Sequence, residues 1–348
     1  MTVRVAVDAT SVTSTGKGIA RVARSTAAAL AEHGLDVTGL AQAGVRLRPP
    51  TETVRARPAV VWEQMGLARA GRRFDVVLTF TERLPVFGSG RFVVWLFELP
   101  ERRIAQNEAA SAYQRGSDRL TRALWKRSVR RAWRVAAGSR WTASELEEAV
   151  PELAGEVRVI YPGLDPHFGP GPGAESDRYV FHLGSSDPRD NTATVVRAFE
   201  RANARLAGPA RLVIGGALGE RRTELEQLGV AGVEFTGRLS DEELVARYRG
   251  ASAYLDATLY EGFGYQAAEA MACGAPFVGS SATSIPEVVG DAGLLCNPRD
   301  VDALAAALTR VLVEPELAGR LRMSGFARAQ QFTWQRTAES LADLVSET

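Results

Sequence analysis

The sequence predicts an α/β protein with two doubly wound domains, and three observations support this class. The chain has 348 residues, more than one ordinary hydrophobic core requires. Short β-branched runs alternate with helical patterns of about 10–15 residues, which is typical of parallel strands joined by helical crossovers. One segment dense in glycine and proline, residues 163–177, interrupts this rhythm. We therefore expect one domain on each side of it.

In the first half, a strand at 3–8 leads into a loop that contains Gly16 and Gly18. Apolar residues then follow at helical spacing over 19–33. A long basic helix is expected over 111–131. Further strands are predicted at 75–80, 92–97, 133–137 and 157–161.

The second half repeats the pattern after the break at 163–177, which we interpret as an interdomain hinge. Strands are predicted at 179–184, 211–215, 233–236, 253–256 and 276–279, and closing helices at 300–313, 316–331 and 334–346. Two such domains would place a ligand site outside the carboxyl ends of their strands.

Composition excludes several classes of function. Lysine and arginine number 42 against 41 aspartates and glutamates, so the formal net charge of +1 gives no electrostatic basis for nucleic-acid binding. No apolar run approaches the ~18 residues of a membrane span, and the first residues lack the apolar core of a signal peptide. Two cysteines and three histidines make a disulfide framework or a zinc site improbable. We expect a cytoplasmic protein without a resident metal.

The most informative stretch is 260–286 (YEGFGYQAAEAMACGAPFVGSSATSIP). A predicted strand runs into Glu261 and the glycines at 262 and 264, and a helix begins at Gly264 or Tyr265. Glycines allow close backbone approach, and a helix N-terminus favours an anion. A carboxylate repels phosphate, so Glu261 and Glu269 are better suited to accept hydrogen bonds from sugar hydroxyls on either side of it. These features together predict a nucleotide-sugar site; on glycine spacing alone, an ordinary strand–helix turn with two surface glutamates explains them equally well.

The spacing of Glu261 and Glu269, with Ala-Met-Ala-Cys-Gly-Ala-Pro from 270 and Ile-Pro-Glu-Val-Val from 285, closely resembles the signature of the family 4 retaining nucleotide-sugar glycosyltransferases. The resemblance covers nearly the whole chain. It includes Gly-Ile-Ala-Arg at 18–21, Pro-Gly-Leu-Asp at 162–165, Gly-Arg-Leu-Ser at 237–240 and the segment 291–304.

This resemblance implies the GT-B fold, in which two Rossmann-like domains face each other across a cleft. Residues 1–165 would bind the acceptor and residues 166–333 the nucleotide-sugar donor. The C-terminal helix, 334–348, would cross back to the first domain, and closure about the hinge would exclude water.

The resemblance also implies roles for individual residues. Glu269 would bind the ribose hydroxyls, and Glu261, a catalytic residue, would contact the donor sugar. The backbone of the glycine-rich loop would bind the diphosphate and the sugar hydroxyls. The base of the nucleotide would lie beside the loop that follows the strand at 233–236. The donor-binding residues are then Gly262, Phe263, Gly264, Tyr265, Gly184, Arg238 and Leu239, with Gly18 on the acceptor side.

The expected reaction moves a hexose-type sugar from a nucleotide diphosphate sugar to an acceptor hydroxyl with retention, and no tightly bound cofactor is expected. Family chemistry needs no protein nucleophile, because the departing diphosphate takes the acceptor proton; the protein positions the substrates and stabilises the leaving group. GDP-, UDP- and dTDP-sugars all stay open as donors. The acceptor is a glycan, a lipid-linked sugar or a natural product.

The sequence departs from the family at two positions beside the expected diphosphate. Where relatives usually offer an arginine and a lysine, this chain has Ser185 and Asp190. An aspartate ~5 Å from the phosphate would cost about 3 kcal/mol at an effective dielectric constant of 20. Three interpretations follow: Arg189 supplies the charge, a divalent cation bridges Asp187 or Asp190 to the phosphate, or normal donor binding is lost. The last would make the chain a non-catalytic binding relative or a pseudo-glycosyltransferase.

A second departure lies at Glu98, in Phe-Glu where many relatives have His-Asp. Glu98 either orients a substrate hydroxyl, as a second catalytic acid, or caps a solvated loop. Lys17 and Arg21 are further candidates beside the acceptor, although Lys17 is equally explained as a solvated loop residue. The basic helix 111–131 is either a solvated face or a contact for the inner, anionic face of the membrane.

Overall fold

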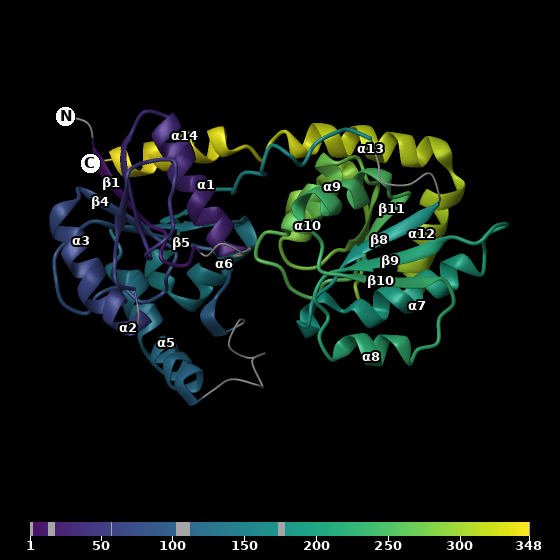
Figure 1. Ribbon diagram of the computed structural model, residues 1–348, viewed down its shortest axis with the longest axis horizontal. Coiled ribbons are helices and arrows are strands. Elements are labelled where there is room, and N and C mark those ends of the chain that lie inside the picture. The colour runs from purple at the N-terminus through teal and green to yellow at the C-terminus, as the bar shows by residue number, and fades with distance from the viewer. Residues whose placement is uncertain (1–2, 13–17, 57, 102–111, 173–177, 348) are drawn as a thin grey trace. The chain divides into compact units, whose positions relative to one another are not determined.

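The computed structural model describes residues 3–12, 18–56, 58–101, 112–172 and 178–347. The chain divides into two compact units (Figure 1). The first combines Met1–Gly163 with Thr333–Thr348, and the second is the continuous stretch Leu164–Phe332. Both are α/β units with a parallel sheet covered by helices, as the alternating sequence pattern predicts.

The first unit contains a seven-stranded sheet in the order β3-β2-β1-β4-β5-β6-β7, and every neighbouring pair is parallel. From β1 the chain builds outward through β2 and β3, and it then returns to the other side of β1 to add β4. The sheet therefore reverses its direction of growth between β1 and β4. Its strands are β1 Arg4–Asp8, β2 Asp36–Ala41, β3 Thr51–Thr53, β4 Val76–Thr79, β5 Phe92–Leu96, β6 Arg134–Ala137 and β7 Val157–Val159.

Helices of the first unit differ in what they bury. The basic helix α5 turns Trp125 and Val129 into the core, while several of its arginines stay exposed. A π-helical turn, η1, continues α2 into α3, a distortion that is frequent at functional sites. The helical segments of this part are α1 Ile19–Glu32, α2 Ala59–Val61, η1 Trp62–Gly66, α3 Leu67–Arg73, α5 Ala112–Arg131, α6 Arg140–Ala149 and the 3₁₀ turn η2 Pro151–Leu153.

The last helix, α14 (Trp334–Ser346), belongs to the first unit and packs against α1 (Figure 1). The Thr337 hydroxyl donates a hydrogen bond to the Tyr161 carbonyl at 2.8 Å. Gly163 faces the start of the helix so closely that a Cβ there would lie 2.3 Å from the Trp334 nitrogen. Only glycine fits at this position.

The second unit contains a six-stranded parallel sheet in the order β10-β9-β8-β11-β12-β13. The first three strands extend to one side of β8 and the last three to the other, so this sheet reverses between β8 and β11. Its strands are β8 Tyr179–Leu183, β9 Arg211–Gly215, β10 Val233–Gly237, β11 Ala253–Asp256, β12 Phe277–Ser280 and β13 Gly293–Cys296.

Helices α7 and α12 pack together over one face of this sheet, and α10 packs against α13. The helical segments are η3 Pro188–Asp190, α7 Thr192–Asn203, α8 Arg221–Glu226, α9 Asp241–Gly250, α10 Tyr265–Ala272, α11 Ile285–Val289, η4 Gly290–Ala292, α12 Val301–Val313 and α13 Pro315–Ala329. The three closing helices thus lie within a residue or two of their predicted ranges.

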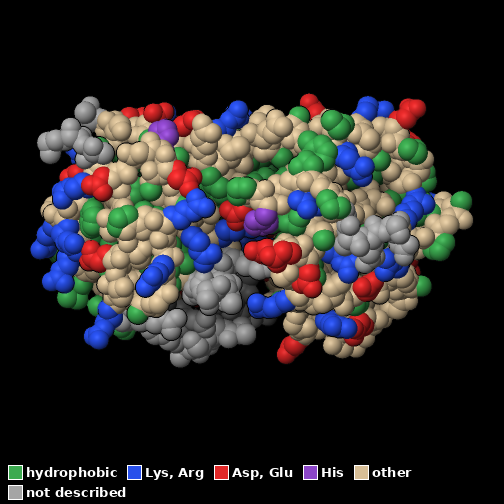
Figure 2. All heavy atoms as spheres, turned by 45° about the horizontal axis from the view of Figure 1, so that its top comes forward, with side chains coloured by type: hydrophobic (Ala, Val, Ile, Leu, Met, Phe, Trp, Pro, Cys, Tyr) green, Lys and Arg blue, Asp and Glu red, His purple; other side chains and the backbone are tan. Residues whose placement is uncertain are grey.

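The surface agrees with the balanced composition. In Figure 2, acidic and basic side chains are interspersed over both units on the face shown. Among the described residues, no helix is both long and apolar enough to cross a bilayer.

Candidate functional site

The loop between β11 and α10 is the centre of the predicted donor site, and a glycine fixes its shape. Gly264 caps the N-terminus of α10 with a left-handed φ of 91°. A Cβ at this position would also lie 2.7 Å from Ile285 Cδ1. Both backbone conformation and space therefore require glycine here. The helix that follows directs the positive end of its dipole toward the loop.

Glu261 is held in this loop through its backbone. Its N–H donates to Thr283 Oγ1 at 3.0 Å, and its carbonyl accepts a hydrogen bond from Ser284 Oγ at 2.8 Å. These contacts tie the loop to the segment after β12, while the Glu261 side chain is half-buried.

Glu269 lies on α10 with only 3% of its surface exposed. The Tyr248 hydroxyl of α9 donates to its Oε2 at 3.5 Å. Phe263 is also buried, with its ring 5.2 Å from that of Tyr265 and 5.3 Å from that of Phe332. Glu269, the residue predicted to bind the ribose, thus lies behind the loop with little of its surface open to solvent.

The turn after β8 holds Arg189 beside this loop. The Arg189 guanidinium donates to Asp187 Oδ2 from Nε at 2.9 Å and from Nη2 at 2.7 Å, and it lies 5.8 Å from the Tyr260 ring centre. The Arg189 carbonyl accepts a hydrogen bond from the Leu259 N–H at 2.8 Å. The structure therefore brings the two predicted phosphate-binding segments together, and it gives Arg189 a carboxylate partner within its own turn.

Asp190, the residue that replaces the usual lysine, closes the same turn. Its Oδ2 accepts a hydrogen bond from the Ser185 N–H, directly after Gly184. Burial raises the pKa of Asp190, and Asp187 raises it further, while the bond from Ser185 opposes the shift. The two departures from the family pattern are therefore one feature, a carboxylate bound to the backbone of its own loop.

Two further buried groups lie under this site. Burial raises the pKa of Asp256 to about 7, although its Oδ1 accepts a hydrogen bond from the Thr258 N–H at 2.8 Å. Burial lowers the pKa of His182 to about 4, so its ring is neutral. His182 Nδ1 then donates to the Leu255 carbonyl at 2.9 Å, and Nε2 accepts from Thr192 Oγ1 at 3.1 Å. His182 thus ties β8, β11 and α7 together, while Asp256 holds the start of the loop that follows β11.

The remaining donor candidates follow neighbouring strands. Leu239 lies after β10 so close to β9 that a Cβ on Gly215 would be 2.8 Å from its Cδ1. A Cβ on Gly216 would meet the Gly184 carbonyl at 1.9 Å. Gly184 and Leu239 thus lie along one sheet edge, and Arg238 is exposed beside them. This edge contains the reversal between β8 and β11, where ligands bind in open α/β sheets.

The acceptor-side candidates lie in the first unit. Gly18 caps α1 with a φ of 62°, and Glu98 is half-buried two residues after β5. Arg21 lies in the first turn of α1. Lys17 falls outside the described residues.

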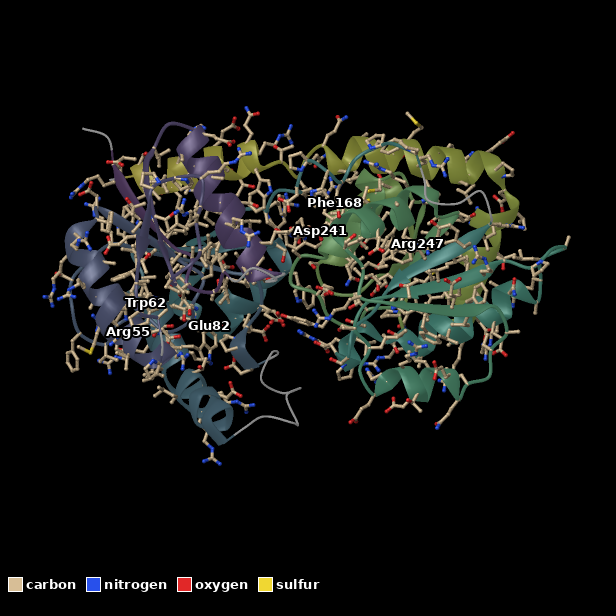
Figure 3. All side chains as sticks on the ribbon, viewed as in Figure 1. Arg55, Trp62, Glu82, Phe168, Asp241 and Arg247 are labelled. Atoms are coloured by element: carbon tan, nitrogen blue, oxygen red, sulfur yellow. The ribbon has the colours of Figure 1, made fainter. Side chains whose placement is uncertain are left out.

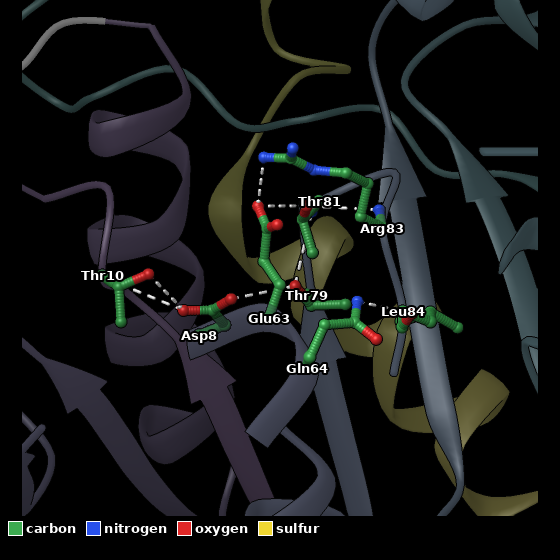
Figure 4. Close-up of polar contacts among 8 residues, drawn as sticks. All are labelled: Asp8, Thr10, Glu63, Gln64, Thr79, Thr81, Arg83 and Leu84. Atoms are coloured by element: carbon green, nitrogen blue, oxygen red, sulfur yellow. Dashed lines mark hydrogen bonds and ion pairs between the residues drawn. The ribbon is translucent and has the colours of Figure 1, made fainter. Parts of the chain in front are cut away.

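Sequence reasoning missed a polar cluster at the carboxyl ends of β1 and β4, drawn in Figure 4. Asp8 Oδ1 accepts from Thr10 Oγ1 at 2.7 Å, and Asp8 Oδ2 accepts from Thr79 Oγ1 at 3.0 Å. Beside them Glu63 Oε1 accepts from Arg83 Nη2 at 2.7 Å and from Thr81 Oγ1 at 3.4 Å. We call these six residues the β1/β4 cluster.

Its members are up to 75 positions apart in the sequence. They come together through the β1–β4 pairing, the β4–β5 loop and the turn η1, which carries Glu63. The one sequence signal that could have indicated this cluster is the polar residue that ends each of the two central strands, Asp8 in β1 and Thr79 in β4. No three His, Cys, Asp or Glu side chains within the described ranges are grouped as metal ligands. The cation interpretation of Asp187 and Asp190 therefore gains no further ligand from this part of the chain.

Two parallel-sheet Rossmann-like units define the GT-B class, and comparison with a solved structure agrees. HepE from Anabaena, solved with UDP-glucose, superposes with a TM-score of 0.75 over 99% of both chains at 16% identity. At this identity the likeness shows the fold alone.

The family follows from the sequence comparisons. A model described as Glycosyltransferase Family 4 matches residues 16–168, and one described as Glycosyl transferases group 1 matches residues 177–314. The chain belongs to the family 4 glycosyltransferases.

Two named relatives illustrate the range of the family. O-antigen chain mannosyltransferase B of Escherichia coli is 35% identical over 162 residues, 45% of this chain. A D-inositol 3-phosphate glycosyltransferase of Saccharomonospora viridis is 32% identical over 226 residues, 58% of this chain. The matches span 42% and 52% of these relatives' own lengths.

Proposed function

We propose that the protein transfers a hexose-type sugar from a nucleoside diphosphate sugar to an acceptor hydroxyl with retention of configuration. The observation that carries the proposal is the junction of β11 and α10 at the reversal of the second sheet. There a glycine-capped helix N-terminus suits a diphosphate, and carboxylates at Glu261 and Glu269 lie before and within the helix.

In this proposal Glu269 accepts hydrogen bonds from the ribose hydroxyls and Glu261 from the donor sugar. Tyr248 already orients Glu269, which limits the reorganisation needed when a ligand arrives. The acceptor hydroxyl attacks from the face that the diphosphate leaves, and a diphosphate oxygen takes its proton. The protein contributes position and charge stabilisation.

Arg189 supplies the positive charge that the family pattern lacks. It would exchange the Asp187 carboxylate for the donor diphosphate, so one anion replaces another and Arg189 stays paired throughout. Asp190 keeps its bond to the Ser185 N–H and stays a structural residue.

The test measures binding of UDP, GDP and dTDP by calorimetry, and transfer from the matching sugar donors to a panel of methyl glycosides. We expect one nucleotide to bind with or without EDTA, and the anomeric proton of the product to keep the donor configuration by NMR. Glu269→Gln should weaken nucleotide binding at least tenfold, whereas Glu316→Gln, an exposed change on α13, should not. An inverted product would refute retention.

A non-catalytic binding relative is the alternative, and the Asp187–Arg189 pair is the observation that favours it. If Arg189 never leaves Asp187, the donor diphosphate has no cation from this turn. That alternative requires weak nucleotide binding and no transfer from any donor. HepE, which was solved with UDP-glucose, makes UDP the first nucleotide to try.

We also propose that the first unit contacts an anionic membrane surface. Phe87 is 85% and Met65 70% exposed, and the Val86 N–H donates to Gln64 Oε1 at 2.8 Å, which joins their two segments. Arg131, at the end of the basic helix α5, donates to the Val86 carbonyl. Apolar tips beside arginines suit a lipid interface.

Co-sedimentation with phosphatidylglycerol vesicles at low salt tests this contact. Phe87→Ser should reduce the bound fraction severalfold, while Met323→Ser, at a residue of the second unit that is 66% exposed, should leave it unaltered. Equal binding of both variants and the parent would refute the surface.

A further inference from the structure

The β1/β4 cluster occupies the position in the first sheet that the donor candidates occupy in the second. Asp8 and Thr79 are the last residues of β1 and β4, the two strands between which the sheet reverses. Ligands of open α/β sheets bind outside the carboxyl ends of the strands at such a reversal. Topology therefore marks this edge as a binding site of the first unit.

The cluster is built inside the protein. Asp8, Glu63, Thr79 and Arg83 are all buried, and Glu63 is only 7% exposed. Burying two carboxyl groups and one guanidinium carries a desolvation penalty that one ion pair seldom offsets, so such groups rarely serve stability. Burial raises the pKa of Asp8, and that of Glu63 to about 7 against the opposing effect of Arg83.

One buried oxygen of the cluster has no hydrogen-bond partner among the residues that the structure describes. Glu63 Oε1 accepts from Arg83 and Thr81, but no described residue donates to the buried Oε2. In Figure 4 the Glu63 side chain points toward Thr81 and Arg83, and the half-buried residues Thr81 and Glu82 bring this edge to the surface. A buried carboxyl oxygen without a partner is unfavourable, so a ligand hydroxyl that reached it would gain a strong, charge-assisted bond.

Charge limits the kind of ligand. The cluster holds two carboxyl groups and one guanidinium, and Glu63 already holds the Arg83 Nη2. Glu82, which follows Thr81, raises the pKa of Glu63 and adds a third carboxylate nearby (Figure 3). When Asp8 and Glu63 are ionised, a phosphate or carboxylate group would face net negative charge here, whereas a hydroxyl can donate to the carboxylates and accept from the threonines.

Aromatic rings stand beside the polar groups. The ring centre of Trp95 lies 5.9 Å from that of Phe80, between Thr79 and Thr81, and 4.9 Å from that of Phe97. Phe80 and Phe97 are half-buried at the same sheet edge. Apolar walls with a few convergent polar groups are the usual lining of a site that binds a small organic ring.

We propose that the β1/β4 cluster is the acceptor subsite, and that it receives an uncharged sugar ring through its hydroxyls and not a phosphorylated acceptor. This inference rests on the proposed function, because it names the acceptor class of that reaction. Glu63 Oε2 takes a ligand hydroxyl, Thr81 sets the orientation of the carboxyl group, and Phe80 lies against the apolar side of the ring.

The experiment measures sugar binding directly, so it does not require transfer. Saturation-transfer NMR titrations use methyl α-mannopyranoside and mannose 6-phosphate as the neutral and the phosphorylated probe. We expect the neutral sugar to bind at least tenfold more tightly than the phosphate. Glu63→Gln and Thr81→Val should each weaken the neutral sugar at least fivefold, and Glu52→Gln, in an exposed ion pair of the same unit, should not.

Circular dichroism establishes that each variant is folded, and UDP, GDP and dTDP titrations establish the state of the donor site. Tighter binding of the phosphorylated probe, or unchanged sugar binding in both folded variants, overturns the subsite. Failure of the parent protein to bind either sugar while it binds a nucleotide also overturns it and leaves the donor function standing. If the parent protein binds the neutral sugar but none of the nucleotides, the donor function is refuted and the sugar subsite stands.

Discussion

The two sheets of this protein reverse direction in the same way but equip the reversal with different chemistry. In the first unit the edge is formed by side chains, with an Arg83–Glu63 pair whose side chains are each 9% exposed. In the second it is formed by glycines, a helix N-terminus and an Arg189–Asp187 pair that is 21% and 28% exposed. The contrast teaches that one topology can carry two kinds of chemistry, and in our proposals the backbone groups serve an anion and the buried side chains serve hydroxyls.

Buried acids at the two edges titrate alike but are compensated differently. Glu63 and Asp256 both have pKa values raised to about 7 by burial. Arg83 opposes the shift at Glu63, whereas Asp190 adds to the shift at Asp256. The first edge thus carries an internal counter-charge, and the second leaves its arginine near the surface, where an incoming anion can take it.

The largest effect is expected from Gly264→Ala, which distorts the β11–α10 loop of the second unit and leaves the first unit unchanged. The change strains a left-handed residue and drives a Cβ into Ile285, at a combined cost of about 2–4 kcal/mol. Nucleotide binding should fall by two orders of magnitude or more, because the helix N-terminus moves. Urea unfolding and calorimetry measure the two effects; wild-type nucleotide affinity in this variant would contradict the placement of the donor site.

The next largest effect concerns pH and the first edge. Glu63 has a folded pKa of about 7 against an ordinary glutamate value of 4.5, so its protonated form favours the fold below pH 4.5. That contribution is lost as pH rises to about 7, and amounts to about 3 kcal/mol at most. Glu63→Gln removes this dependence, so its unfolding free energy relative to the parent should rise between pH 5 and pH 8. A flat difference would mean that Glu63 ionises normally.

A smaller effect separates the two members of the half-buried Arg189–Asp187 pair. Arg189→Ala should weaken binding of the preferred nucleoside diphosphate about tenfold, a loss of about 1.4 kcal/mol. Asp187→Asn removes the competing carboxylate and should tighten binding about two- to threefold, since Arg189 no longer has to leave an anion. Titrations with and without EDTA measure both; weaker binding in Asp187→Asn, reversed by EDTA, would favour a bridging cation.

The smallest effect is expected at Gly18, the counterpart of Gly264 in the first unit. Both glycines cap the helix that follows a strand and have positive φ, but a Cβ at Gly18 meets no atom of the described residues within 4 Å. Gly18→Ala should therefore cost only about 1–2 kcal/mol of backbone strain and leave nucleotide affinity unaltered. A shift of the urea midpoint larger than that of Gly264→Ala would contradict this comparison.

The two edges also differ in how far the sequence predicts them. The loop around Glu261 and Gly264 is contiguous, so its glycines, its acids and the helix start all appear within ten residues. The partner of Arg189 was missed although Asp187 lies two positions away, because sequence gives no side-chain orientation. Likewise the sequence left open whether Arg189, a cation or neither compensates for Asp190 beside the diphosphate, because the bond from Ser185 to Asp190 depends on the path of the turn.

The first edge could not be predicted, because its residues meet only through the fold. Asp8 and Thr79 are brought together by the β1–β4 pairing, and Glu63 arrives on a π-helical turn that no periodicity indicates. β2 and β3 were not predicted either: β2 contains Gly39, which packs under Leu47, and β3 is three polar residues long.

The placement of α14 in the first unit has a consequence for biosynthesis. The ribosome finishes the rest of that unit at Gly163 and then adds about 170 residues before α14 begins. At 5–20 residues per second this interval is roughly 9–34 s, and during it the surface of α1 that α14 covers is bare. The second unit, one uninterrupted stretch, can complete its fold in the meantime, so the half of the protein that is made first is the half that matures last.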